Sequence, residues 1–158
     1  MPTTAEDVLA DQYPLPAFYF KVVFSGLNGK TDTAFQDVRG IASEMETEEV
    51  HEGGENRFVY QLPKGVKHPQ IELKRGIARL SSPVVQWCRQ TLDLGWNQPI
   101  KTSLVSVYLL NANGDPARAW SFANAYPVKW EVDEFKSTKS EVAIETIVLS
   151  YTYSNRTL

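Results

Sequence analysis

The sequence predicts a mainly β protein, a small β-barrel or sandwich of about eight strands with one α-helix packed on it. Short strand-like runs follow one another, separated by turn clusters. Within Pro127–Phe135, apolar Val128, Trp130 and Val132 alternate with charged residues, which is the period of a half-buried strand. Apolar residues recur at helical spacing in Val84–Leu92. At 158 residues, we expect positions 1–158 to form a single domain with a sizeable core.

The N-terminal third predicts two strands after a polar lead-in. Residues 1–12 are polar, and the two prolines of Tyr13–Pro16 favour an extended chain. The run Ala17–Phe24 predicts a strand whose inward face carries Phe18, Phe20, Val22 and Phe24. After a turn at Gly26, Ala34–Ile41 is expected to return along this strand, with Gly40 at a bend.

The middle of the chain changes in composition. Ser43–Asn56 is acidic and ends in two glycines, and Arg57–Leu62 predicts a strand that stops at a Pro63-Lys64-Gly65 turn. Gln70–Ile77 predicts another strand, with Ile71, Leu73 and Ile77 inward. A helix follows, for which Ser81 or Ser82 is the expected cap, Pro83 the first turn and Gly95 the end.

The C-terminal part predicts four strands: Lys101–Leu110, Arg118–Ala123, Pro127–Phe135 and Glu141–Tyr153. In the last run, Val142 and Ile144 share one parity and the later apolar residues take the other. Either a bulge near Glu145–Thr146 re-aims the side chains, or both faces are covered, the second by a helix or another copy. The residues expected to pack this terminal strand are Trp130, Ile144, Ile147, Leu149 and Tyr151.

Composition and motifs point away from several classes of protein. The net charge of −3 disfavours a general nucleic-acid surface, and the single Cys88 excludes an intrachain disulfide framework. A soluble intracellular protein is expected, since the chain has neither a long apolar run nor a basic start. His51 and His68 share no metal-ligand spacing with Cys88, and no nucleophile elbow or phosphate loop occurs. We therefore expect no cofactor, no metal and no enzymatic activity.

Charge is segregated along the middle of the chain. Six glutamates within Glu44–Glu55 precede five Lys or Arg residues within Lys64–Arg79. These segments either pair within one molecule, or the acidic segment of one copy meets a basic surface of the next, a contact that generates rings or filaments. The candidate contact residues are Glu46, Glu48, Glu49, His51, Glu52, Glu55, Lys64, Lys67, Lys74 and Arg75.

Several short segments, taken together in their order and spacing, resemble the tail tube proteins of contractile phages and of bacterial contractile injection systems. They lie along almost the whole chain: Tyr13–Phe20, Phe35–Ile41, Leu73–Ile77, Trp87, Trp120–Pro127 and Glu141–Thr146. The resemblance implies a structural subunit that forms hexameric rings, stacked into a hollow inner tube. It also implies an extended hairpin, by position Ser43–Phe58, that reaches an adjacent ring.

The same resemblance implies partners and a location. These are further copies, sheath, baseplate and other tube proteins, with DNA or protein cargo in the lumen, after synthesis in the bacterial cytoplasm. The acidic hairpin and the aromatic end at Ser150–Tyr153 depart from a main tube subunit and leave open a baseplate-proximal one. The alternative is a monomeric barrel whose apolar ligand contacts Phe18, Phe20 and Trp130.

Overall fold

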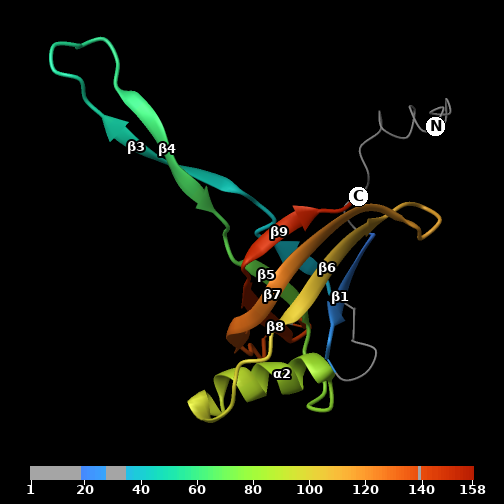
Figure 1. Ribbon diagram of the computed structural model, residues 1–158. Coiled ribbons are helices and arrows are strands. Elements are labelled where there is room, and N and C mark those ends of the chain that lie inside the picture. Colours follow the sequence, from blue (N-terminus) through green and yellow to red (C-terminus); the bar gives the residue numbers. More distant parts are fainter. Residues whose placement is uncertain (1–18, 28–34, 139) are drawn as a thin grey trace.

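A computed structural model describes residues 19–27, 35–138 and 140–158, so Phe18 and the Tyr13–Pro16 segment lie outside it. The described residues form nine strands, one α-helix and one 3-10 turn (Figure 1). The elements are β1 (Phe20–Ser25), β2 (Asp37–Arg39), β3 (Glu44–Val50), β4 (Tyr60–Lys67), β5 (Ile71–Gly76), α2 (Pro83–Leu92), η1 (Gly95–Asn97), β6 (Ser103–Leu110), β7 (Pro116–Val132), β8 (Ile144–Ser150) and β9 (Tyr153–Arg156).

Seven strands form one open sheet in the order β1-β6-β7-β8-β5-β2, with β9 also paired to β7. The mainly β prediction is confirmed, although this sheet does not close into a barrel. The first part of β7 pairs with β6 and β9, and its second part pairs with β8. The sheet therefore has two halves that share β7. We call β1-β6-β7-β9 the four-stranded half, and β7-β8-β5-β2, in which β7 adds only its second part, the second half.

Strand β7 was predicted as two strands, Arg118–Ala123 and Pro127–Phe135, and that separation is wrong. It is one strand of 17 residues. Asn124 has a φ of 53°, and the register with β8 shifts between Pro127 and Lys129. A left-handed residue and a bulge bend a strand without ending it, so β7 passes from one half of the sheet to the other.

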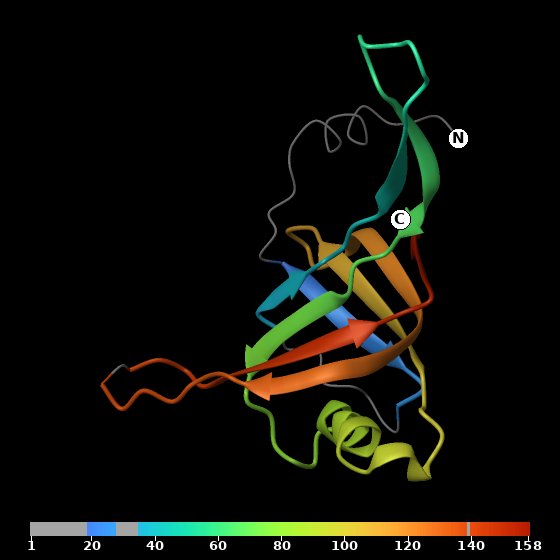
Figure 2. The ribbon, with the colours of Figure 1, turned by 90° about the vertical axis from the view of Figure 1, so that its left-hand side faces the viewer.

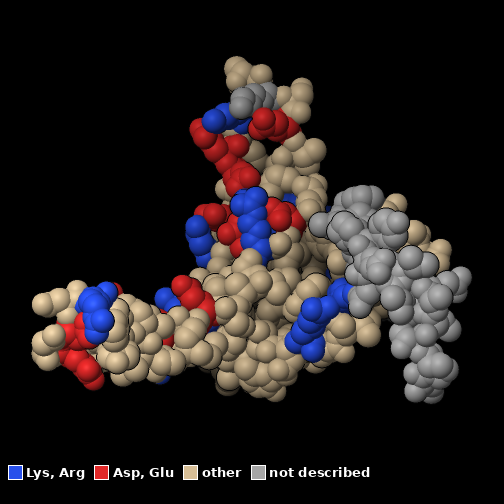
Figure 3. Space-filling model, turned by 90° about the horizontal axis from the view of Figure 1, so that it is seen from above, with Lys and Arg blue, Asp and Glu red and all other residues tan. Residues whose placement is uncertain are grey.

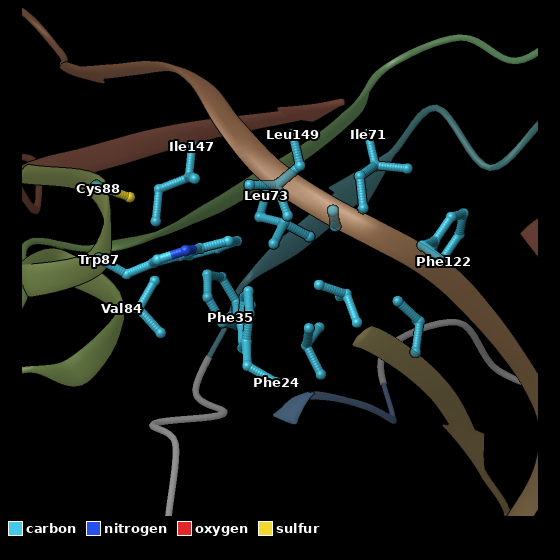
Figure 4. Close-up of a cluster of buried hydrophobic side chains, with 14 residues drawn as sticks. Phe24, Phe35, Ile71, Leu73, Val84, Trp87, Cys88, Phe122, Ile147 and Leu149 are labelled. Carbon is cyan, nitrogen blue, oxygen red and sulfur yellow. The ribbon is translucent and has the colours of Figure 1, made fainter. Parts of the chain in front are cut away.

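The buried core lies between the two halves of the sheet, and α2 closes one end of it (Figures 2 and 4). Trp87 of α2 packs edge-on against Phe24 of β1, with ring centroids 5.8 Å apart. Its indole Nε1 donates a hydrogen bond of 2.7 Å to the Lys101 carbonyl oxygen. The other buried members are Val22, Phe35, Ile71, Leu73, Val84, Cys88, Val105, Val107, Phe122, Ala125, Ile147 and Leu149.

The predicted helix start is confirmed and its end is not. Ser82 occupies the N-cap position and Pro83 the first turn. The Ser82 hydroxyl makes no capping hydrogen bond and instead accepts one of 3.3 Å from Arg75 Nη2. The helix ends at Leu92, and Gly95, with a φ of 66°, begins the 3-10 turn.

The first two strands do not pair with each other, contrary to the prediction. Strand β1 pairs with β6, and the short β2 pairs with β5. The expected bend at Gly40 is confirmed, because its φ is 87°. A Cβ atom there would lie 2.1 Å from the Gln70 carbonyl oxygen, so no other residue fits without a shift of the backbone.

Strand β8 has no bulge at Glu145–Thr146, since its register with both neighbours is continuous there. The side chains of Ile147 and Leu149 are buried, Ile144 is half-buried, and Trp130 and Tyr151 pack against the core cluster. The opposite face of the second half carries ion pairs, Lys74–Glu72 at 3.3 Å and Lys129–Glu131 at 2.7 Å. That face therefore combines charged side chains with the half-buried Ile144 and Val148, and more exposed apolar side chains lie elsewhere. The aromatic end continues into a ninth strand, β9, which sequence patterning missed.

Candidate functional site

The most distinctive feature of the molecule is a hairpin of β3 and β4 that projects from the body (Figures 1 and 2). All residues of both strands are exposed. The pairing runs from Glu44–Lys67 to Val50–Tyr60, so the hairpin is longer than the expected Ser43–Phe58. The predicted turn at Pro63-Lys64-Gly65 lies inside β4, where a register shift opposite Glu46–Thr47 accommodates it.

The hairpin carries exposed acidic side chains along β3 and exposed apolar side chains on both strands, including Met45 and Val66 near the body. Cross-strand hydrogen bonds of 3.0 Å join Gln61 to both Thr47 and Glu49 on one face. On the other face, Tyr60 packs edge-on against Phe58, with centroids 5.0 Å apart. Exposed apolar surface of this extent marks an interaction site. We define the hairpin tip as Val50, Phe58, Val59, Tyr60 and Leu62, and the stem acids as Glu44, Glu46, Glu48 and Glu49.

The candidate acidic residues all lie on this hairpin. Glu46, Glu48 and Glu49 belong to β3, and His51 and Glu52 follow it in the connecting loop. Near the end of the hairpin, acidic and basic side chains lie close together (Figure 3). There Arg57 pairs with Glu55 at 3.0 Å, and its hydrogen bonds lower the pKa of that carboxyl group.

The candidate basic residues do not form one surface. Lys64 and Lys67 lie on β4, so they belong to the hairpin itself, and Lys67 Nζ is 4.0 Å from Glu46 Oε1. Lys74 pairs with Glu72 on the body. If the acidic and basic segments pair within one molecule, the described ion pairs provide one weak contact between them, that of Lys67 with Glu46. The five Lys and Arg residues of the basic segment do not form one cluster.

Arg75 is a correction to the expected contact set, because it is buried. Arg75 and Glu145 are directly opposite each other on β5 and β8, are each 1% exposed, and are joined at 2.5 Å. Trp130 Nε1 donates to the second Glu145 oxygen at 3.1 Å, and the Phe35 ring lies 5.1 Å from the guanidinium carbon. Ile77, also predicted to lie inward, is exposed and lies just beyond the end of β5 at Gly76. The missed signal was parity, since Arg75 continues the alternation of Ile71 and Leu73.

Among the described residues, no further strand pairs with the outer edges of β1 and β9 in the four-stranded half. Its adjacent strands are all antiparallel, so β1 and β9 run in opposite directions. An exposed strand edge presents unpaired backbone groups to which another chain can add a strand. On the open face of this half, Val23, Ser106, Ser121 and Asn155 lie in one cross-strand row. No Asp or Glu occurs in β1, β6, β9 or residues 116–125 of β7.

The described residues give little support to a metal site or to a nucleophilic cysteine. No group of three or more potential metal ligands was found among them, and none of their helices is long and apolar enough to span a membrane. Burial away from water, with a smaller effect of the Glu145 charge, raises the pKa of the Cys88 thiol to about 12. This thiol is therefore protonated at neutral pH, as expected of a core residue and not of a nucleophile.

Comparison with known proteins gives a consistent picture. The profile of the family described as T4-like virus tail tube protein gp19 matches residues 16–155. A chain of the anti-feeding prophage baseplate is 27% identical, with a TM-score of 0.77, over 91% of this chain and 95% of that chain. A chain of the PVC extracellular contractile injection system sheath–tube complex is 22% identical, with a TM-score of 0.77, over 97% of each.

A more distant similarity extends to Hcp1 from Flavobacterium johnsoniae, which is 15% identical with a TM-score of 0.56. It covers 89% of this chain and 95% of that chain. A search of curated proteins found no match. The matches that are less than 25% identical concern the fold alone.

Proposed function

The chain belongs to the family of T4-like virus tail tube proteins, and from this premise we propose that its copies form hexameric rings stacked into a hollow inner tube. It is a structural subunit of a contractile tail or injection system. Its role is mechanical, without catalysis. The observation that carries the proposal is the projecting hairpin, whose tip and stem are exposed throughout the isolated chain.

The ring forms by pairing the outer edge of β1 in one copy with the outer edge of β9 in the next. The two edges run antiparallel, so each junction continues the strand alternation of the four-stranded half. Such a contact joins unlike surfaces, and repetition of the same rotation closes a ring. The open face with Ser106, Ser121 and Asn155 then lines the lumen, and its strands contribute no carboxylates to the wall.

Stacking of the rings depends on the hairpin, which extends well beyond the body (Figure 1). A two-stranded hairpin is marginally stable on its own in water, so burial of its apolar tip against an adjacent ring favours the ordered form. The acidic stem sets register more than affinity.

The partners in the particle are the sheath around the tube, the baseplate at its end and other tube proteins, with DNA or protein cargo in the lumen. The 27% identical chain comes from a baseplate, which supports a position close to the baseplate. The protein is made in the bacterial cytoplasm and ends in a tail or injection particle. The alternative of a ligand-binding barrel is weaker, because Phe20 and Trp130 pack onto the core and the sheet is open.

Negative-stain microscopy of the purified protein tests the proposal, with rings or tubes as the expected result. The triple variant Glu48→Lys, Glu49→Lys, Glu52→Lys should keep single rings and lose stacks, since all three residues are exposed on the hairpin. Lys129→Glu serves as a charge-reversal control outside the hairpin, because Lys129 lies on the face of the second half that points away from the core. Discrete monomers at every concentration would contradict the ring proposal.

A further inference from the structure

The surface around α2 contains two hollows, and none of the contact residues expected from the sequence lines them. On the basis of the proposed function, we propose that this surface is the acceptor for the hairpin of a second copy in the adjacent ring. The α2 end comprises residues 77–102, from the end of β5 to the start of β6. The inference therefore names both partners of the stacking contact.

The hairpin and the α2 end lie at opposite ends of the molecule. Two views related by a rotation about the vertical axis both place the hairpin at the top and α2 at the bottom (Figures 1 and 2). Copies stacked in one orientation along that direction bring the hairpin of one against the α2 end of the next. This head-to-tail contact joins unlike surfaces, so it repeats without limit along a tube.

The hairpin lacks sufficient positive charge of its own. Residues 44–67 contain six glutamates and three Lys or Arg residues, a net charge of −3. Two of the described ion pairs involve these glutamates, those of Glu46 and Glu55. Glu44, Glu48 and Glu52 form no ion pair with a described residue. The body positions first expected to balance them are occupied, because Lys74 pairs with Glu72 and Arg75 is buried with Glu145.

The α2 end has the opposite charge. Residues 77–102 contain Arg79, Arg89 and Lys101 against one acid, Asp93, which lies 3.9 Å from Arg89. Arg79 and Lys101 are exposed and form no ion pair with a described residue. Nothing acidic lines the hollows described next.

Two hollows at this end share Trp87, Gln90 and Lys101 in their lining. The amide groups of Gln90 and Gln98 line them and supply donors for carboxylates, whereas the Gln86 amide donates to the Leu80 carbonyl oxygen. Five large apolar side chains are exposed at this end, of which Leu80 is 56% exposed, and we call them the apolar rim: Ile77, Leu80, Leu92, Leu94 and Ile100. The α2 end thus offers exposed apolar side chains beside hollows that are lined by Lys101 and amide groups.

The two surfaces are complementary in both respects. The apolar tip, in which Phe58 is 49% exposed, matches the apolar rim, and the stem acids match Arg79 and Lys101. Apolar burial provides the attraction, and the opposite charges exclude a reversed stack, which would bring acidic hairpins together.

Charge exchange between two proteins tests the pairing. The variant of the α2 end, which we call the groove variant, carries Arg79→Glu and Lys101→Glu. The hairpin variant carries Glu48→Lys and Glu49→Lys. Each variant alone places like charges in the contact, so the concentration needed for stacking should rise at least about tenfold, with rings unchanged. A mixture of the two variants presents opposite charges at every contact and should restore stacks of alternating rings, seen by light scattering and microscopy.

Cysteine cross-linking provides a second measurement. Phe58→Cys combined with Gln90→Cys should form a disulfide between copies on mild oxidation, because the native Cys88 is buried. Ser106→Cys in place of Gln90→Cys is the matched control and should not cross-link to the tip.

The outcomes separate the two proposals. Rings that never stack, stacks unaffected by the groove variant, or mixtures without rescue would overturn the acceptor inference while leaving the rings intact. A protein that forms neither rings nor the disulfide between Phe58→Cys and Gln90→Cys would overturn both the ring proposal and the acceptor inference.

Discussion

Arg75 and Glu145 are the two residues that most affect the interior of this protein. Both are buried, face each other across β5 and β8, and satisfy further polar groups on Trp130 and Ser82. Removal of one partner leaves a buried charge without its counterion, which costs much more than the pair as a whole contributes. Sequence alone placed Arg75 in a basic run. Its parity with Ile71 and Leu73 indicates an inward position, but its partner Glu145 is identified only when the pairing of β5 with β8 is known.

Glu145→Ala should therefore lower the free energy of unfolding by about 3–5 kcal/mol, measured by urea denaturation. The double variant Arg75→Met, Glu145→Leu fills the same space with apolar side chains and should recover most of this loss. Equal destabilisation in the single and double variants would show that packing volume, and not the unpaired charge, accounts for the effect.

The burial of Cys88 makes the unfolding free energy of the protein depend on pH. The thiol of the unfolded chain ionises near pH 9.0, whereas the folded thiol stays protonated up to about pH 12. The folded-state pKa is raised, so its contribution to stability is complete below pH 9 and is lost as the pH rises toward 12. Unfolding free energy should fall more steeply over this range than in Cys88→Ala.

Thiol reactivity provides the independent measurement at residue scale. A maleimide reagent at neutral pH should label Cys88 only after unfolding, since the native thiol is both protonated and buried. Rapid labelling of the native protein would contradict the packed position of α2 on the core.

At the scale of elements, the hairpin and the body differ in what orders them. No residue of β3 or β4 is buried, whereas β5 and β8 contribute Ile71, Leu73, Ile147 and Leu149 to the core. The hairpin therefore contributes little to the stability of the isolated chain. Its register was only partly predictable, because Pro63 and Gly65 have the composition of a turn, and only pairing with β3 shows that the strand continues through them.

Replacement of residues 45–66 by Asn-Gly should leave the body folded, with a change of about 1 kcal/mol or less in unfolding free energy. Glu44 and Lys67 are cross-strand partners, so a two-residue turn can connect them. Sedimentation should show rings without stacks. A loss of several kcal/mol would mean that the hairpin supports the body.

At the scale of the whole molecule, assembly depends on the free strand edges. Thr157 N donates to Ala119 O, and hydrogen-bonded pairs alternate along an antiparallel ladder. The amides of Ser154 and Arg156 therefore point to the free edge of β9, and that of Asn155 points to β7. These outward amides are the ones that a neighbouring β1 would pair with.

Ser154→Pro should abolish rings while changing the unfolding free energy of the monomer by about 1 kcal/mol or less, since proline is tolerated on an edge. Asn155→Pro instead removes a bond to β7 and should destabilise the monomer by about 1–3 kcal/mol. Size-exclusion chromatography and thermal unfolding measure the two effects. Intact rings in the Ser154→Pro protein would exclude β9 as the joining edge.

The sequence by itself determined the mainly β class, most of the strands, the start of the helix, the bend at Gly40 and the family. These follow from local signals, namely side-chain periodicity, proline and glycine positions, and short motifs in order. Only the tertiary structure decided that β7 is continuous, that Arg75 is buried with Glu145, and that exposed apolar side chains lie on the hairpin, on the α2 end and at Phe135 and Val142. The physical reason is that strand pairing and charge pairing join residues far apart in the chain, and a one-dimensional pattern does not contain their partners.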